Sequence, residues 1–253
     1  MPPKIVAVAN QKGGVAKTTT VHSLGAALAE RGRRVLLVDL DPQACLTYSL
    51  GVRAEELRTS LHDVLVHNTP AEDVLTKVGD VHLLPSTIDL AGSEIYLLSK
   101  TGREFALKKA IEQVVRPYDI VLIDCPPSLG ILTIDGLTAA DEVLIPLQCE
   151  TLSSRGVGQL LETVADVRSF TNPGLRVAGV VATMHDPRTR LGQQVLAAVH
   201  DEHGLELLPP PVPKSVRVAE APASSRSVLE HAPSSKAAEA YRALAAALEA
   251  RLR

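Results

Sequence analysis

The chain has 253 residues, of which 45% are apolar and 22% are charged, and its formal net charge at pH 7 is −3. This composition is typical of a globular protein, which argues against an intrinsically disordered chain and against a surface that is basic throughout. With aromatic residues at only 2% and no tryptophan, nucleic acid would be held by its phosphates rather than by base stacking.

The size and the two ends of the chain bear on its compartment and domain count. No apolar run approaches the roughly 20 residues that a membrane-spanning helix needs. A strand-like segment starts at residue 4 and leaves no room for a signal peptide, so we expect a cytoplasmic protein. Cys45, Cys125 and Cys149 have no C-x-x-C spacing, which favours free thiols over disulfides or zinc. We interpret residues 1–253 as a single domain.

The first elements predict a phosphate-binding loop. Residues 4–9 form a continuous apolar run, typical of a buried parallel strand, and residues 21–31 are rich in alanine and leucine, typical of a helix. Between them lies a glycine-containing turn that ends in Lys17 and Thr18. Backbone N–H groups, the helix dipole and a lysine ammonium therefore converge on one point, which favours a polyphosphate anion.

Two further apolar runs end in carboxylates. Residues 35–40 predict a buried strand that carries Asp39, and Asp41 follows on the same face, so one carboxylate can lie near a metal ion and the other near an attacking water. Residues 119–124 predict another strand that ends in Asp124, in the manner of a Walker B motif. Asp124 would hold Mg²⁺ through water, because Mg²⁺ keeps most of its hydration shell.

The remaining elements complete an alternating pattern. Short helices are expected at 54–57, 61–66 and 71–78, strands at 81–84, 142–147, 175–184 and 205–208, loops at 209–211 and 221–235, and a final helix at 235–253. Strands that alternate with helices predict an α/β fold, with a mostly parallel twisted sheet and helices on both faces. The loops that follow the strands then meet at one edge of the sheet, where ligands bind.

The motifs carry a resemblance to a known family. Lys12-Gly13-Gly14-x-x-Lys17-Thr18 resembles the deviant Walker A motif of the ParA/MinD group of P-loop NTPases. Residues 140–150, 183–191 and 212–222 are similar to the ParA/Soj-type chromosome and plasmid partition ATPases, so the likeness covers nearly the whole chain.

The resemblance implies ATP and Mg²⁺ as cofactors and assigns a role to each motif. Lys12 would reach the nucleotide of a partner subunit, Lys17 would hold the β- and γ-phosphates, and Asp41 would position the attacking water, so these three are the expected catalytic residues. The expected metal shell is Thr18, Asp39 and Asp124. The expected nucleotide contacts are Lys12, Gly13, Gly14, Val15, Ala16, Lys17, Thr18, Thr19, Met184 and Pro213.

The resemblance also implies a nucleotide-gated cycle. ATP would drive homodimerisation, the dimer would bind double-stranded DNA non-specifically, and a ParB-like partner would stimulate slow hydrolysis during chromosome or plasmid segregation, with no membrane involved. Arg188 and Arg217 are the implied DNA contacts. Arg190, Lys214 and Arg226 lie in the same two loop-rich segments and could join them on one face.

Departures from the family pattern leave alternatives open. Ala16 stands where the family has glycine, and a positive φ there would strain the loop. Residues 224–227 and 230–233 also differ from the usual runs, which bears on DNA binding or partner choice. The alternatives are a MinD-like switch on a membrane, a cargo-positioning ATPase on a protein surface, a paralogue that binds nucleotide without hydrolysis, and an iron–sulfur ATPase of the nitrogenase-reductase type.

Overall fold

A computed structural model describes residues 2–149 and 153–252. Its strands form one seven-stranded sheet in the order β3-β4-β2-β5-β1-β6-β7, parallel except for the edge strand β3. The strands are β1 (Lys4–Val8), β2 (Val35–Asp39), β3 (Thr76–Val78), β4 (Val81–Leu84), β5 (Ile120–Asp124), β6 (Glu142–Gln148) and β7 (Arg176–Thr183).

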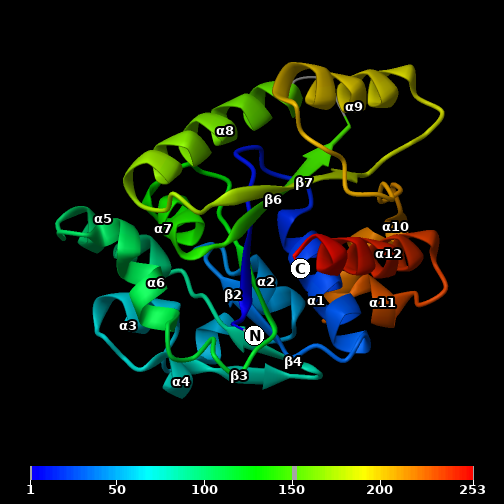
Figure 1. Ribbon diagram of the computed structural model, residues 1–253. Coiled ribbons are helices and arrows are strands. Elements are labelled where there is room, and N and C mark those ends of the chain that lie inside the picture. Colours follow the sequence, from blue (N-terminus) through cyan, green and yellow to red (C-terminus); the bar gives the residue numbers. More distant parts are fainter. Residues whose placement is uncertain (1, 150–152, 253) are drawn as a thin grey trace.

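Helices connect the strands and cover the sheet (Figure 1). The α-helices are α1 (Lys17–Glu30), α2 (Cys45–Ser49), α3 (Leu61–Val66), α4 (Ala71–Val74), α5 (Leu90–Leu98), α6 (Ala106–Ile111), α7 (Ile131–Ala139), α8 (Ser153–Phe170), α9 (Arg190–His203), α10 (Val216–Glu220), α11 (Val228–His231) and α12 (Lys236–Arg251). Three short 3₁₀ helices are η1 (Ala54–Glu56), η2 (Arg103–Phe105) and η3 (Ala221–Ser224).

The sheet separates two apolar cores, because successive side chains of a strand point to opposite faces. In β2, Leu36 and Val38 join the core under α3 and α5–α8, whereas Val35 and Leu37 join the core under α1, α2, α11 and α12. Figure 1 shows α12 beside α1, away from α5 and α6. Every residue of β2 and β5 is buried. The predicted α/β fold with helices on both faces is confirmed.

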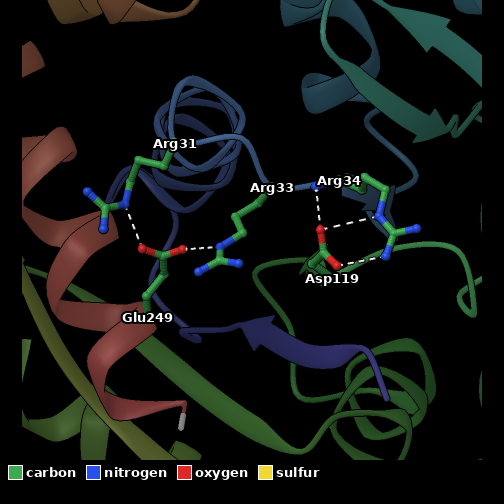
Figure 2. Close-up of polar contacts among 5 residues, drawn as sticks. All are labelled: Arg31, Arg33, Arg34, Asp119 and Glu249. Atoms are coloured by element: carbon green, nitrogen blue, oxygen red, sulfur yellow. Dashed lines mark hydrogen bonds and ion pairs between the residues drawn. The ribbon is translucent and has the colours of Figure 1, made fainter. Parts of the chain in front are cut away.

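Charged groups fasten the edge of the sheet opposite the carboxyl ends of its parallel strands (Figure 2). Glu249 on α12 accepts hydrogen bonds from Arg31 and Arg33, which follow α1. Nearby, Arg34 donates to both oxygens of Asp119 at 2.8 and 3.3 Å. These pairs join the starts of β2 and β5 to the C-terminal helix.

The helix predicted for residues 71–78 is wrong beyond Val74. Residues 76–78 form β3, which pairs antiparallel with β4. Gly79, at φ +54°, and Asp80 make the two-residue turn of a hairpin. β-branched Thr76 and Val78 fit that edge strand better than a helix.

Three other boundaries differ from prediction. The strand expected at 205–208 is only a bridge between Leu207 and Val180, because the prolines that follow cannot donate to a ladder. The loop expected at 221–235 contains η3 and α11, which begins at a capping box between Ser227 and Glu230. Helix α1 begins at Lys17, four residues before the predicted start.

Candidate nucleotide site

The loop between β1 and α1 adopts a conformation that opens its backbone to a ligand. Gly14 has φ +74°, and a Cβ at Gly13 or Gly14 would meet nothing within 4 Å. Ala16 also lies in the left-handed region, at φ 66° and ψ 36°, and is the N-cap of α1. The side chain of Val15 is buried in the core and anchors the loop to it. Exposed glycines directly before a helix N-terminus fit an anion.

Side chains from other elements hold this loop. The Thr183 hydroxyl at the end of β7 donates to the Val15 carbonyl at 3.0 Å. The buried Asn10 amide donates to the Pro146 carbonyl at 2.7 Å, and its oxygen accepts from the Lys12 N–H at 3.0 Å. The loop is therefore preorganised by β6 and β7 as well as by its own glycines.

Lys17 lies at the centre of the site. Its side chain is 7% exposed, and its Nζ donates to the Lys12 carbonyl at 3.2 Å. Burial lowers the pKa of Lys17, and the carboxylates of Asp124 and Asp41 oppose that change together with Cys125. A half-desolvated ammonium beside these carboxylates is a fitting partner for a phosphate.

Asp124, at the end of β5, is a fully buried carboxylate at the base of the site. Neither of its oxygens has a partner of normal geometry among the described residues. Burial and the neighbouring Asp39 raise the pKa of Asp124, and the nearby Thr18 hydroxyl and the Lys17 ammonium oppose them. Orphaned carboxylate oxygens beside a threonine hydroxyl fit a hydrated Mg²⁺.

Asp39 and Asp41 differ in their surroundings. Asp39 pairs in register with Asp124 on the next strand, and its oxygens accept from Thr47 and from the Asp41 N–H. Burial raises the pKa of Asp39 to about 6, although these hydrogen bonds oppose the change. Asp41 lines the same cavity as Lys17, and one of its oxygens accepts from the Gln43 N–H at 2.9 Å. The place of Asp39 in the metal shell therefore stays a prediction.

A cavity of about 980 Å³ lies between the phosphate loop and two segments from later in the chain, which begin at Thr183 and at Val212. Met184 and Pro213, which lie far from the loop in sequence, line it together with the loop residues. A parallel bridge between His185 and Pro213 brings their segments side by side. The predicted nucleotide contacts that line this cavity are Gly13, Gly14, Ala16, Lys17, Thr18, Thr19, Met184 and Pro213.

The same bridge brings together two basic segments, which follow His185 and Pro213. Arg188, Arg190, Lys214 and Arg217 are all exposed. Arg188 pairs with Asp186 at 2.9 Å and Arg217 pairs with Glu220 at 3.0 Å, each within its own segment. Exposed pairs of this kind are weak, so both arginines can exchange their partners for a phosphate.

Sequence reasoning missed Asn10, Thr47, Ser86 and Thr183. They act through hydrogen bonds to residues 8 to 168 positions away, so no local pattern shows them. Ser86 had one usable signal, because it follows a predicted strand at the ligand-binding edge of the sheet.

The chain is similar to known proteins along nearly its whole length. Residues 3–177 match the AAA domain family. The sporulation initiation inhibitor protein Soj of Bacillus subtilis is 45% identical over 96% of both chains. The chromosome-partitioning ATPase Soj of Thermus thermophilus is 46% identical over 98% of this chain and 96% of its own.

A solved structure from Mycobacterium smegmatis is also similar to this chain over most of its length. It is named as cobyrinic acid a,c-diamide synthase with bound ATP analogue and magnesium. It is 50% identical, has a TM-score of 0.85, and the match covers 95% of this chain and 91% of that one. The likeness to Soj over the full length decides the family: the chain belongs to the ParA/Soj partitioning ATPases.

Proposed function

We propose that this chain is an ATP-dependent switch that dimerises with ATP, binds DNA non-specifically as the dimer and releases it after slow hydrolysis, in partnership with a ParB-like protein. One observation carries the proposal: Lys17, Thr18 and Asp41 face one cavity at the carboxyl edge of the sheet, beside the buried carboxylate of Asp124. Membership of the partitioning ATPases supports a cycle of this kind, in which DNA segregation would be the outcome.

The described residues fit Mg-ATP. The open backbone at Gly13 and Gly14 and the Lys17 ammonium would bind the phosphates, and Thr18 with Asp124 would hold hydrated Mg²⁺. Met184 and Pro213 would bound the base. When bound, Mg-ATP supplies the phosphoryl group and the metal charge that stabilises its transfer.

Hydrolysis would depend on Asp41 and Lys12. Asp41 would orient the attacking water, since its carboxylate borders the cavity that holds the phosphates. Lys12 would reach the nucleotide of the partner subunit from a loop whose glycines are exposed. A reaction that needs groups from two subunits is slow until the dimer is assembled.

The surface formed by Arg188, Arg190, Lys214 and Arg217 would bind the DNA backbone. These residues come from segments that the His185–Pro213 bridge holds together, next to the residues proposed to contact the base. Closing of the nucleotide site can therefore change the arrangement of this surface. A dimer presents it twice, and this multiplies the number of phosphate contacts.

Membrane and cargo functions are the alternatives. The apolar face of α12, with Tyr241, Leu244 and Leu248, is buried in the core that contains α1, which favours DNA over a MinD-like membrane anchor. Within residues 2–149 and 153–252, no helix has the length and apolarity to cross a bilayer. A cargo-positioning ATPase would use the same site with a protein surface in place of DNA.

The test is binding to non-specific duplex DNA with ATP, with ADP and without nucleotide, at low and moderate salt. Asp41→Ala would hold the ATP state. We expect tight, salt-sensitive binding with ATP alone. Binding should weaken by about tenfold or more when Arg188→Glu is combined with Arg217→Glu, because affinity for the DNA backbone depends on the number of cations that face its phosphates. Lys77→Glu with Arg116→Glu, both at exposed positions away from the cavity, is the control with the same change in charge.

The outcomes separate the functions. Equal binding with and without ATP would contradict the nucleotide gate, and an equal decrease in both double variants would contradict the assigned surface. If the protein dimerises with ATP but does not bind DNA, flotation with anionic vesicles is the next experiment. ATP-dependent flotation would support the MinD-like alternative. Phosphate release without cobyrinic acid separates the proposal from the activity in the name of the M. smegmatis protein.

A further inference from the structure

A closed ring of buried hydrogen bonds surrounds the backbone of Asp41. Asp39, Thr47 and Ser86 are each fully buried. The Thr47 hydroxyl donates to Asp39 Oδ2 at 2.7 Å and accepts from the Ser86 N–H at 2.9 Å. The Ser86 hydroxyl donates to the Asp41 carbonyl at 2.8 Å, and the Asp41 N–H donates to Asp39 Oδ1 at 3.2 Å.

The ring holds the backbone of Asp41 at both its N–H and its carbonyl. Its N–H is held by Asp39 and its carbonyl by Ser86, whose hydroxyl is also 3.4 Å from the Thr87 carbonyl. The Ala44 N–H donates to the same Asp41 carbonyl at 2.9 Å. The backbone orientation of Asp41, and with it the direction of its carboxylate, therefore depends on groups from β2, α2 and the end of β4.

Each hydroxyl has a defined part in this arrangement. Thr47 already accepts from an N–H, so its single proton is free for Asp39. Ser86 uses its N–H for Thr47, which leaves its hydroxyl proton for Asp41. The loss of either hydroxyl opens the ring and leaves a buried acceptor without that donor.

We infer that Ser86 is a positioning residue for ATP hydrolysis, which acts by holding the backbone of Asp41, with Thr47 as the link that holds Ser86. The inference rests on the proposed role of Asp41 in orienting water. It predicts that the two hydroxyls affect the rate of phosphate release and leave ATP binding nearly unchanged, because neither belongs to the phosphate loop.

The test is Ser86→Ala, measured for phosphate release in single turnovers with excess protein and, separately, for ATP affinity. We expect a fall of about three- to tenfold in rate, the usual range for one neutral hydrogen bond, with the dissociation constant for ATP within about twofold. Thr47→Val should give a similar fall, and Thr47→Ser, which keeps the hydroxyl, should restore the rate.

Ser93→Ala is the matched control. Ser93 is also fully buried and makes one comparable bond, at 2.9 Å, to His62 Nδ1. It should lose as much thermal stability as Ser86→Ala and keep the wild-type rate. An equal loss of rate in both variants would overturn the inference, because destabilisation alone would then explain it.

A double-mutant cycle with Asp41→Ala decides whether Ser86 acts through Asp41. Asp41→Ala keeps the backbone carbonyl but has no carboxylate to position, so Ser86→Ala should have no further effect in that background. A further fall would overturn the inference and leave the role of Asp41 intact. Hydrolysis by Asp41→Ala at the wild-type rate would overturn the role of Asp41 and the inference together, whereas a slow Asp41→Ala beside a normal Ser86→Ala would overturn the inference alone.

Discussion

Ala16 holds a left-handed conformation in the phosphate loop, at φ 66°. An alanine in this region is less stable than glycine by about 1 kcal/mol. The Thr183 hydroxyl and the Asn10 side chain hold the loop through the backbones of Val15 and Lys12, so we expect the cost of this conformation to fall on folding and not on ATP binding. Alanine also has less conformational freedom than glycine in the unfolded chain, which favours folding. This entropic gain and the strain of the left-handed conformation have opposite effects on the free energy of unfolding and nearly cancel.

We therefore expect Ala16→Gly to change the free energy of unfolding by less than about 1 kcal/mol and to leave the dissociation constant for ATP within about threefold. Denaturant unfolding and nucleotide titration measure the two quantities. Ala44→Gly, at another left-handed N-cap with φ 52°, controls for the general effect of the substitution. A gain in ATP affinity above tenfold, confined to Ala16→Gly, would show that Ala16 limits binding.

At the scale of single residues, the sequence predicts groups that belong to a local motif. Lys17 and Thr18 follow a glycine turn, and Asp41 and Asp124 follow apolar strands, and Lys17, Thr18 and Asp41 line one cavity. Ser86 also follows a predicted strand, but it is neither a carboxylate nor part of a glycine turn, so the sequence gives it no specific role. Its importance comes from a hydrogen bond to a residue 45 positions away, which only the folded chain brings within reach.

Among the elements, the C-terminal helix α12 carries one nearly buried carboxylate, Glu249, which pairs with Arg31 and Arg33. Burial alone would raise the pKa of Glu249, but its bonds to Arg33 and Arg31 outweigh burial and lower it. A carboxylate with a lowered pKa stabilises the fold above its unfolded pKa, and this stabilisation is lost as the pH falls through the folded value. Both arginines are more than one-third exposed, so solvent weakens the pairs.

Glu249→Gln should lower the free energy of unfolding by about 1 kcal/mol at pH 7, which corresponds to about 2–4 °C in the thermal midpoint. The difference from the wild type should shrink as the pH falls below about 4.5, the ordinary value for a glutamate, and disappear once the pH lies below the lowered pKa of the folded carboxylate, which is then protonated. Thermal unfolding between pH 3 and pH 7 measures both effects. Glu162→Gln, exposed in the interior of α8, should be nearly neutral, and a pH-independent difference at Glu249 would contradict the ionic explanation.

Secondary structure was predictable where one pattern dominates. β2 and β5 are continuous apolar runs because both faces of a central parallel strand are buried. β3 was missed because its three residues are partly exposed and pair through a Gly79 turn that a helical interpretation of residues 71–78 ignores. α11 was missed because serines and prolines surround its four residues, and its capping box at Ser227 was the available signal.

At the scale of the whole molecule, the proposed cycle needs two subunits. In that cycle the Lys12 side chain would contact the nucleotide of the partner subunit and not the nucleotide of its own. The backbone of Lys12, in contrast, serves its own subunit. Its carbonyl accepts from Lys17 Nζ and its N–H donates to Asn10. Truncation of the side chain keeps both bonds, so it separates the two functions of this position.

Lys12→Ala should therefore bind ATP as a monomer within about threefold of the wild type and fail to dimerise, because the substitution removes only the ammonium that would reach the partner's nucleotide. Sedimentation velocity with ATP, in the Asp41→Ala background that slows hydrolysis, measures the dimer, and Lys77→Ala on the exposed strand β3 is the control. Weak ATP binding by the monomer would mean that the Lys12 side chain serves its own subunit. Normal ATP-dependent dimerisation would rule out this role of Lys12 between subunits, and DNA binding would then have to be gated within a single chain.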